Sequence, residues 1–185
     1  DTVSVVVLDF DKTLIDLHTR SNWAHTAREL ERHVRPVFRA LVPLLLQRNI
    51  VLGIATLSSQ ESLIKELLTR VWPADVRLEE NVFVRGARKS DPTPLMRCDS
   101  SLGMEELAAA ARRQEQNSLA NLHADEVGKR YHIADILTRA HMPDLPHHRV
   151  LFIDDEKNNA ECARADGFRV VQFCLTTHHE DDDAF

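Results

Sequence analysis

The sequence predicts an α/β protein, a three-layer αβα Rossmann-like domain with a mainly parallel central sheet. Short apolar runs of strand length alternate along the chain with segments whose apolar residues recur at helical spacing. The runs at residues 5–8 and 50–55 are apolar throughout rather than alternating, as in strands that are covered on both faces. With 185 residues, the chain is long enough for one such domain with a sizeable core.

The first predicted strand, residues 5–8, ends at two acids one residue apart, Asp9 and Asp11. Two carboxylates at the end of a buried strand cost free energy unless a cation or a reaction requires them. Residues 14–23 have no clear period, so we expect a loop or short flap beside the strand end.

Residues 24–49 are predicted to be mostly helical, because their apolar side chains recur at helical spacing. Pro36 suits a first helical turn, and Pro43 is expected to kink or divide the helix. This loop and the crossover helix fill the interval before the next strand. We therefore expect a minimal cap domain or none.

The second strand is predicted over residues 50–56. Ser58 is followed three residues later by Glu61, a capping-box pattern that predicts a helix from Ser58 to about residue 71. A third strand is expected within residues 76–84.

The middle of the chain is the least regular. Residues 85–101 are polar and predict a loop, and residues 104–115 are rich in alanine and predict a helix. We interpret residues 85–124 as an insertion or embellishment of a single domain that covers residues 1–176.

The last third of the chain predicts two more helices and two more strands. These are a helix at 130–140, a strand at 150–155, a helix at 158–165 and a strand at 168–173. Gly167 supplies the stop of the second helix. Residues 177–185 are expected to form an acidic tail outside the domain.

Composition excludes several classes of protein. No apolar run approaches the length of a membrane span, and a net charge of −6 gives no electrostatic footprint for nucleic acid. The three cysteines are widely spaced, which favours reduced thiols and a cytoplasmic location. The chain begins at Asp1 without a signal-peptide pattern, so upstream targeting information is expected to be missing.

Polar residues follow three of the predicted strands, and a lysine precedes the helix at 130–140. If the strands are parallel neighbours, their carboxyl ends converge at one edge of the sheet. Four carboxylates there would repel one another, and a hard cation such as Mg²⁺ relieves that repulsion. The residues concerned are Asp9, Asp11, Thr56, Lys129, Asp154 and Asp155.

The order of these residues resembles the four motifs of the haloacid dehalogenase superfamily. The motifs are Asp9-x-Asp11-x-Thr13, then Thr56, then Lys129, then Asp154-Asp155 with Asn159. Gly128-Lys129-x-x-His132 and the segment around Asp154 are similar to the small, capless magnesium-dependent phosphatases of that superfamily. Those enzymes act on phosphotyrosine in proteins and on sugar phosphates. The resemblance therefore implies a phosphorylated small molecule or a phosphoprotein as substrate.

The resemblance also implies a role for each motif residue. Asp9 is the nucleophile that forms an aspartyl-phosphate, and Asp11 is the general acid and base. Dehalogenase members lack this second acid, so Asp11 favours a phosphatase. Thr56 and Leu57 bind the transferring phosphoryl group, and Lys129 neutralises charge on the nucleophile and the phosphate.

A Mg²⁺ cofactor follows from the same resemblance. Its candidate ligands are Asp9, Asp11, Asp154 and Asp155, with Asp154 binding directly or through water. Asn159 is expected to support the loop that carries the last two acids.

Other interpretations stay open at this point. A phosphoacceptor signalling domain uses a similar residue set around Mg²⁺, although its acid pair lies on the first strand and its acceptor on a later one. A phosphotransferase could pass the aspartyl-phosphate to an acceptor other than water, and a binding module could keep the fold without catalysis. We also hypothesise that His18, Arg20 and Trp23 line the rim of the site and contact substrate.

Overall fold

The computed structural model describes residues 2–20, 22–72, 78–87 and 128–174, and each structural statement below concerns these residues. Five strands form one sheet, in the order β3-β2-β1-β4-β5, and every neighbouring pair is parallel. The strands are β1 (Val5–Asp9), β2 (Val51–Ala55), β3 (Val82–Arg85), β4 (Val150–Asp154) and β5 (Arg169–Gln172). The predicted α/β class with a parallel sheet is confirmed.

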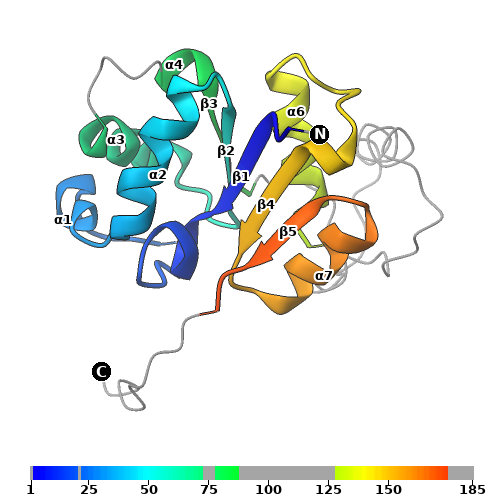
Figure 1. Cartoon of the computed structure of the whole chain (residues 1–185). Helices are drawn as coiled ribbons and strands as arrows, with labels where there is room; N and C mark the ends of the chain where they lie inside the picture. The colour runs from blue at the N-terminus through cyan, green and yellow to red at the C-terminus, as the bar shows by residue number, and fades with distance from the viewer. Residues whose placement is uncertain (1, 21, 73–77, 88–127, 175–185) are drawn as a thin grey trace, which may run out of the picture.

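Helices cover both faces of the sheet, which makes the three layers (Figure 1). One face packs against α1 (Ala27–Glu31), α2 (Pro36–Gln47) and α3 (Glu61–Val71). The other packs against α6 (Arg130–Arg139) and α7 (Lys157–Ala165). Successive β1 side chains supply the two cores in turn, Val6 to the first and Val7 to the second, so the all-apolar pattern of the strand reflects burial on both sides.

β1 lies at the centre of the sheet, between β2 and β4. The register pairs Asp9 with Ala55 and Leu8 with Ile153, so the three strands end at the same level. Thr56 and Asp154 are therefore carried to the same edge as Asp9, as the convergence argument predicted.

The predicted helix at residues 24–49 is two helices, α1 and α2, and the break falls at residues 32–35. Pro36 opens α2 as expected, and of the two outcomes expected at Pro43, a kink or a division, the division does not occur, because α2 continues through the proline. A proline leaves the carbonyl four residues earlier without its helical donor. Here that carbonyl belongs to Arg39, and the indole Nε1 of Trp72 donates to it at 3.3 Å.

The predicted capping box at Ser58 is also wrong. α3 begins at Glu61, and the Ser58 hydroxyl accepts a hydrogen bond from the Gln60 amide at 3.2 Å. The Glu61 carboxylate instead accepts from the amide of Gly86, just beyond β3, at 2.9 Å. A capping box does exist at Thr26 and Glu29, where it starts α1.

The remaining predicted elements are present with small shifts. β3 lies at the end of the expected interval, after the short α4 (Leu78–Asn81), and Gly167 follows α7 with a φ of +84°. The short η3 (His147–Arg149) precedes β4. The expected helix at 104–115, the insertion beyond residue 87 and the tail at 177–185 lie outside the described residues. Within the described residues, no helix is both long and apolar enough to cross a membrane.

Candidate active site

A pocket of about 180 Å³ opens at the carboxyl edge of the sheet. It brings together side chains from the ends of β1, β2 and β4 and from the start of α6. Its lining is Asp9, Asp11, Lys12, His18, Thr56, Leu57, Lys129, Asp154, Asp155, Glu156 and Asn159. All the residues that the sequence assigned to catalysis, phosphate binding, metal binding or support thus border one pocket.

Asp9 is the last residue of β1 and is 5% exposed. Its Oδ1 accepts from the ammonium of Lys129. Burial raises the pKa of Asp9 from its ordinary 3.8 to about 7; the charge of Lys129 opposes this rise and that of Asp154 adds to it. The pKa of Asp9 is therefore raised mainly because burial disfavours the charged carboxylate, and Lys129 offsets only part of this effect.

Lys129 stands at the N-cap of α6 and is also 5% exposed. Its Nζ donates to Asp9 and, at 3.0 Å, to Oδ2 of Asp154. Burial alone would lower the pKa of Lys129, but the two carboxylates outweigh it and hold the pKa above its usual value. Lys129 is therefore the shared cation between β1 and β4.

The backbone before Lys129 is shaped by Gly128, which has a φ of +57°. A Cβ on Gly128 would lie 3.2 Å from the Cβ of Cys162 and 3.3 Å from Oδ1 of Asn159. Glycine thus meets two demands here, a left-handed turn and close contact with α7. The turn directs Lys129 into the pocket.

Asp154 is completely buried at the end of β4, and both of its carboxylate oxygens accept hydrogen bonds. Besides Lys129, the donors are the amide of Glu156 at 2.8 Å and Nδ2 of Asn159 at 3.1 Å. Asn159 lies on α7, so its contact with Asp154 is the geometry expected of a supporting residue. Its supporting role remains a prediction.

Asp155 is held from the opposite side by Thr13. The Thr13 hydroxyl donates to Oδ1 of Asp155 at 3.1 Å and accepts from the Asp155 amide at 3.0 Å. Thr13 is completely buried. It belongs to the first motif, and that membership was the one sequence signal for this link between two motifs 142 residues apart.

Asp9, Asp154 and Asp155 form the group of acidic side chains, within the described part of the chain, that could hold a metal ion. One oxygen from each lies within 4.8 Å of the others. Lys129 supplies one positive charge against these three negative charges. Carboxylate oxygens are the ligands that Mg²⁺ prefers, so the donor set fits this ion.

Asp11 is not part of that group, although it was also a candidate metal ligand. It lies in the π-helical turn η1 (Phe10–Leu14) directly after β1. Its carboxylate accepts from the amide and hydroxyl of Thr19, at 3.1 and 2.8 Å, and lies 3.0 Å from Nδ1 of His18. Thr19 is buried and carries no sequence signal, because it follows Asp11 through an irregular loop.

Thr56 and Leu57 reach the pocket from the end of β2. The Thr56 amide donates to the carbonyl of Arg85 at 2.9 Å, and its hydroxyl accepts from the Ser58 amide at 3.1 Å. Thr56 is buried, whereas Leu57 is 49% exposed. The two predicted phosphate-binding residues therefore occupy the wall of the pocket, beside Asp9.

Of the three residues hypothesised to form the rim, His18 lines the pocket, and Arg20 and Trp23 do not. The main chain of Trp23 is instead paired with the side-chain amide of Gln60. Its amide donates to Oε1 at 2.8 Å, and its carbonyl accepts from Nε2 at 3.0 Å. This pairing ties the loop after β1 to the loop after β2.

The chain thus has a parallel α/β sheet whose carboxyl edge carries the residues of all four motifs identified in the sequence. No protein-family model matches the sequence, and no curated protein matches it. Several solved structures match the chain, among them the following three. For a putative phosphatase from Clostridium difficile, the match covers 92% of this chain and 84% of that one, with 11% identity and a TM-score of 0.48.

The second structure is a HAD family enzyme from Bacteroides thetaiotaomicron. That match covers 96% of this chain and 97% of that one, with 9% identity and a TM-score of 0.49. The third is CbbY from Rhodobacter sphaeroides in complex with xylulose-1,5-bisphosphate, with coverages of 99% and 92%, 14% identity and a TM-score of 0.49. At these values the matches carry no argument about activity, which has to be argued from the site.

Proposed function

We propose that this chain is a Mg²⁺-dependent phosphatase that hydrolyses phosphomonoesters through an aspartyl-phosphate on Asp9. The observation that carries the proposal is the surroundings of Asp9. A buried carboxylate is ion-paired to Lys129 and lies beside two further carboxylates in the lining of one pocket. Phosphoryl transfer needs this kind of positioning and charge neutralisation more than elaborate covalent chemistry.

In the first step, an ionised carboxylate oxygen of Asp9 attacks phosphorus, and the bond between phosphorus and the ester oxygen breaks. Asp11 gives its proton to the departing ester oxygen, which leaves as an alcohol or phenol. Lys129 stabilises the charge on Asp9 and on the transferring group. The Thr56 hydroxyl, 3.1 Å from the Ser58 amide, would hydrogen-bond a phosphoryl oxygen.

In the second step, a water molecule attacks the phosphorus of the aspartyl-phosphate while Asp11 takes its proton. The bond between phosphorus and the Asp9 oxygen breaks, and inorganic phosphate and the free Asp9 carboxylate result. The contacts of Asp11 with Thr19 and His18 hold the proton-transferring carboxyl at the pocket wall through both steps.

Mg²⁺, when bound by Asp9, Asp154 and Asp155, would neutralise phosphoryl charge and orient the phosphate. The same ion would favour the ionised form of Asp9 that the attack requires. Asn159 and Lys129 keep Asp154 oriented, and Thr13 keeps Asp155 oriented. Partners of metal ligands are commonly as important as the ligands themselves.

The substrate class proposed is a phosphomonoester, either a phosphoprotein side chain such as phosphotyrosine or a phosphorylated small molecule such as a sugar phosphate. Both classes follow from the sequence resemblance. His18 and Leu57 line the same pocket with exposed side chains, which could contact either kind of substrate. A panel of phosphopeptides and phosphometabolites would distinguish them.

The test is hydrolysis of an aryl phosphate, with and without Mg²⁺, by the native chain and by Asp9→Asn. We expect activity that requires Mg²⁺ and is lost in the variant. Activity that survives Asp9→Asn would contradict the nucleophile assignment. A stable aspartyl-phosphate on the native chain, with little release of inorganic phosphate, would favour the phosphoacceptor alternative. Transfer to an added alcohol would favour a phosphotransferase.

A further inference from the structure

The turn between Asp11 and Thr13 has an unusual backbone for its sequence. Lys12 has a φ of 59° and a ψ of −11°, in the left-handed region that favours glycine. The Lys12 amide donates to the carbonyl of Leu17 at 3.0 Å, which closes the turn on one side. A lysine in this conformation is strained and needs contacts from elsewhere to hold it.

Further contacts to this turn come from Arg35, which precedes α2. Its Nη2 donates to the carbonyl of Lys12 and its Nε to the carbonyl of Thr13, both at 3.0 Å. Its backbone amide donates to the carbonyl of Leu14, also at 3.0 Å. Arg35 therefore binds three consecutive carbonyls of the turn that carries the first motif.

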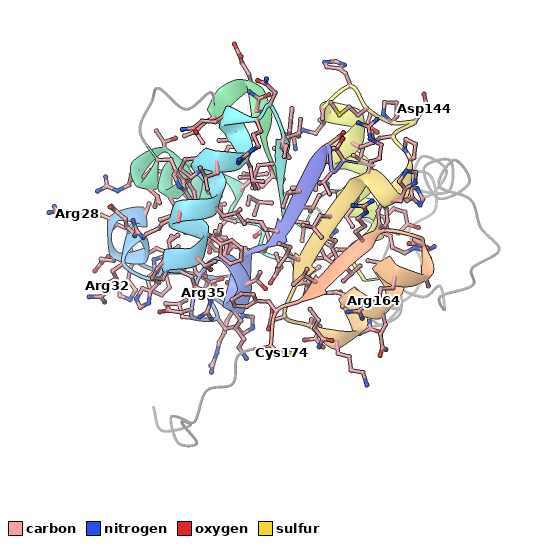
Figure 2. The ribbon with its side chains drawn as sticks, in the orientation of Figure 1. Arg28, Arg32, Arg35, Asp144, Arg164 and Cys174 are labelled. Carbon is pink, nitrogen blue, oxygen red and sulfur yellow. The ribbon has the colours of Figure 1, made fainter. Side chains whose placement is uncertain are left out.

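The guanidinium of Arg35 is itself held in place by Phe173, which follows β5. The guanidinium carbon lies 5.4 Å from the centre of the phenyl ring. The Phe173 amide donates to the carbonyl of Asp154 at 2.8 Å. Figure 2 shows Arg35 at the edge of the molecule toward which the strand arrows of Figure 1 point. Arg35 thus connects the first-motif turn to the end of β4.

We propose that Arg35 is a positioning residue for the metal site, and that it acts through the Lys12 turn and Thr13 on Asp155. The link from the turn to the metal site is Thr13, whose hydroxyl both donates to and accepts from Asp155. When the Lys12 carbonyl loses its donor, the strained turn relaxes and Thr13 moves away from Asp155. The inference rests on the proposed function, because Asp155 is proposed there as a Mg²⁺ ligand.

Arg39 offers a matched control. It lies one helical turn after Arg35, and its guanidinium also donates to two backbone carbonyls, those of Val34 and Glu31. Neither carbonyl belongs to the first-motif turn. Arg39→Met therefore removes the same number and kind of hydrogen bonds without touching the proposed path.

The experiment is Mg²⁺ titration by calorimetry on the full chain, for the native protein and for Arg35→Met, Arg39→Met, Lys12→Gly and Lys12→Gly with Arg35→Met. We expect Arg35→Met to weaken Mg²⁺ binding by about tenfold or more, as loss of a ligand's supporting partner does. Arg39→Met should stay within about twofold of the native chain, which is the spread expected where the metal ligands are untouched. Near-ultraviolet circular dichroism checks that each variant is folded.

The two variants that carry Lys12→Gly distinguish a positioning role of Arg35 from a general effect on stability. Glycine adopts the left-handed conformation without steric cost, so the turn no longer depends on Arg35 when residue 12 is glycine. The double variant should then bind Mg²⁺ within about threefold of Lys12→Gly alone, a coupling that a double-mutant cycle measures. If Arg35→Met does not fold, Arg35→Lys serves instead, because lysine keeps the charge but cannot bind both carbonyls in the same fork.

Two results would overturn the inference alone: Arg35→Met binding Mg²⁺ as Arg39→Met does, or the double variant showing the full loss seen in Arg35→Met. A native chain that binds no Mg²⁺ would overturn the proposed function together with this inference. Measuring the native chain first therefore tells the two failures apart.

Discussion

Lys129 and Arg130 are neighbours in sequence, and each makes a buried ion pair, but the two pairs differ in charge balance. Arg130 binds one carboxylate, that of Asp166, through both Nε and Nη2. Lys129 lies between Asp9 and Asp154, and Asp155 is close by. One pair is balanced, and the other has more negative than positive charge.

The difference supports the proposed catalytic role of the cluster around Lys129 and a structural role for the pair of Arg130 and Asp166. The pair of Arg130 and Asp166 links the start of α6 to the end of α7, and both side chains are buried. Around Lys129, the excess of carboxylate contributes to a raised pKa of Asp9 and leaves room for a cation. An unbalanced buried cluster is a poor way to hold helices together and a good way to bind a metal and a phosphate.

The largest expected effect comes from breaking the unbalanced cluster. Lys129→Met should lower kcat/KM for an aryl phosphate by about 10³-fold, because it removes a preorganised charge beside the nucleophile. Lys157→Met is the control, since Lys157 has a 74% exposed side chain on α7. Equal kinetics for both variants would remove Lys129 from the mechanism.

Breaking the balanced pair should mainly affect stability. Arg130→Met should lower the free energy of unfolding by about 3–5 kcal/mol, because Asp166 is left buried without a counter-charge. A second change, Asp166→Leu in the same chain, should recover most of that loss, since no unpaired charge then remains. Urea unfolding measures both, and a double variant as unstable as the single one would contradict this account.

A smaller effect is expected from neutralising Asp9 in the metal-free protein. The folded pKa of about 7 lies above the ordinary 3.8, so Asp9 favours folding below about pH 4, and this contribution is lost as pH rises to 7. Asp9→Asn has no such loss. At pH 8 its free energy of unfolding should therefore exceed that of the native chain by at least ~1 kcal/mol. At pH 4 the difference should vanish.

Urea unfolding with a chelator present, at pH 4 and pH 8, is the measurement. Addition of Mg²⁺ at pH 8 should stabilise the native chain more than Asp9→Asn, because one ligand carboxylate is missing from the variant. If the free energy of unfolding changes with pH in the same way for both proteins, the pKa of Asp9 is not raised in the folded chain.

The smallest effect belongs to an exposed pair, Lys157 with Glu161 on α7. The side chains are 74% and 57% exposed, and Nζ and Oε1 are 3.6 Å apart. Glu161→Gln should change the free energy of unfolding by less than about 0.5 kcal/mol, since water and salt screen such pairs. A larger change in a urea titration would mean that the contributions of the ion pairs to stability do not follow their burial.

Much of this site was predictable because strand order and strand ends obey simple rules. Asp9, Thr56 and Asp154 each follow an apolar run, and parallel strands end at one edge. Lys129 was identified by its place in the motif series, and the structure brings it to the same pocket. The resemblance supplied the proposed roles, which stay predictions until they are tested.

The errors have a common cause, because each involved a local pattern that a distant residue overrides. Ser58 and Glu61 have capping-box spacing, but Glu61 binds the Gly86 amide instead. Pro43 did not divide α2, because Trp72 donates to the carbonyl that the proline leaves free. Thr19 had no pattern at all, and its contact with Asp11 depends on how the loop folds back.

By itself, the sequence determined the fold class, the sheet-edge location of the site and the acids that meet there. These depend on apolar runs and on the geometry of parallel strands, which are local properties repeated along the chain. Only the tertiary structure decided the charge balance around Lys129, the hydrogen bonds of Arg35 to the first-motif turn and the partners of Asp11. Such features depend on distances between side chains far apart in sequence, and no local pattern encodes those distances.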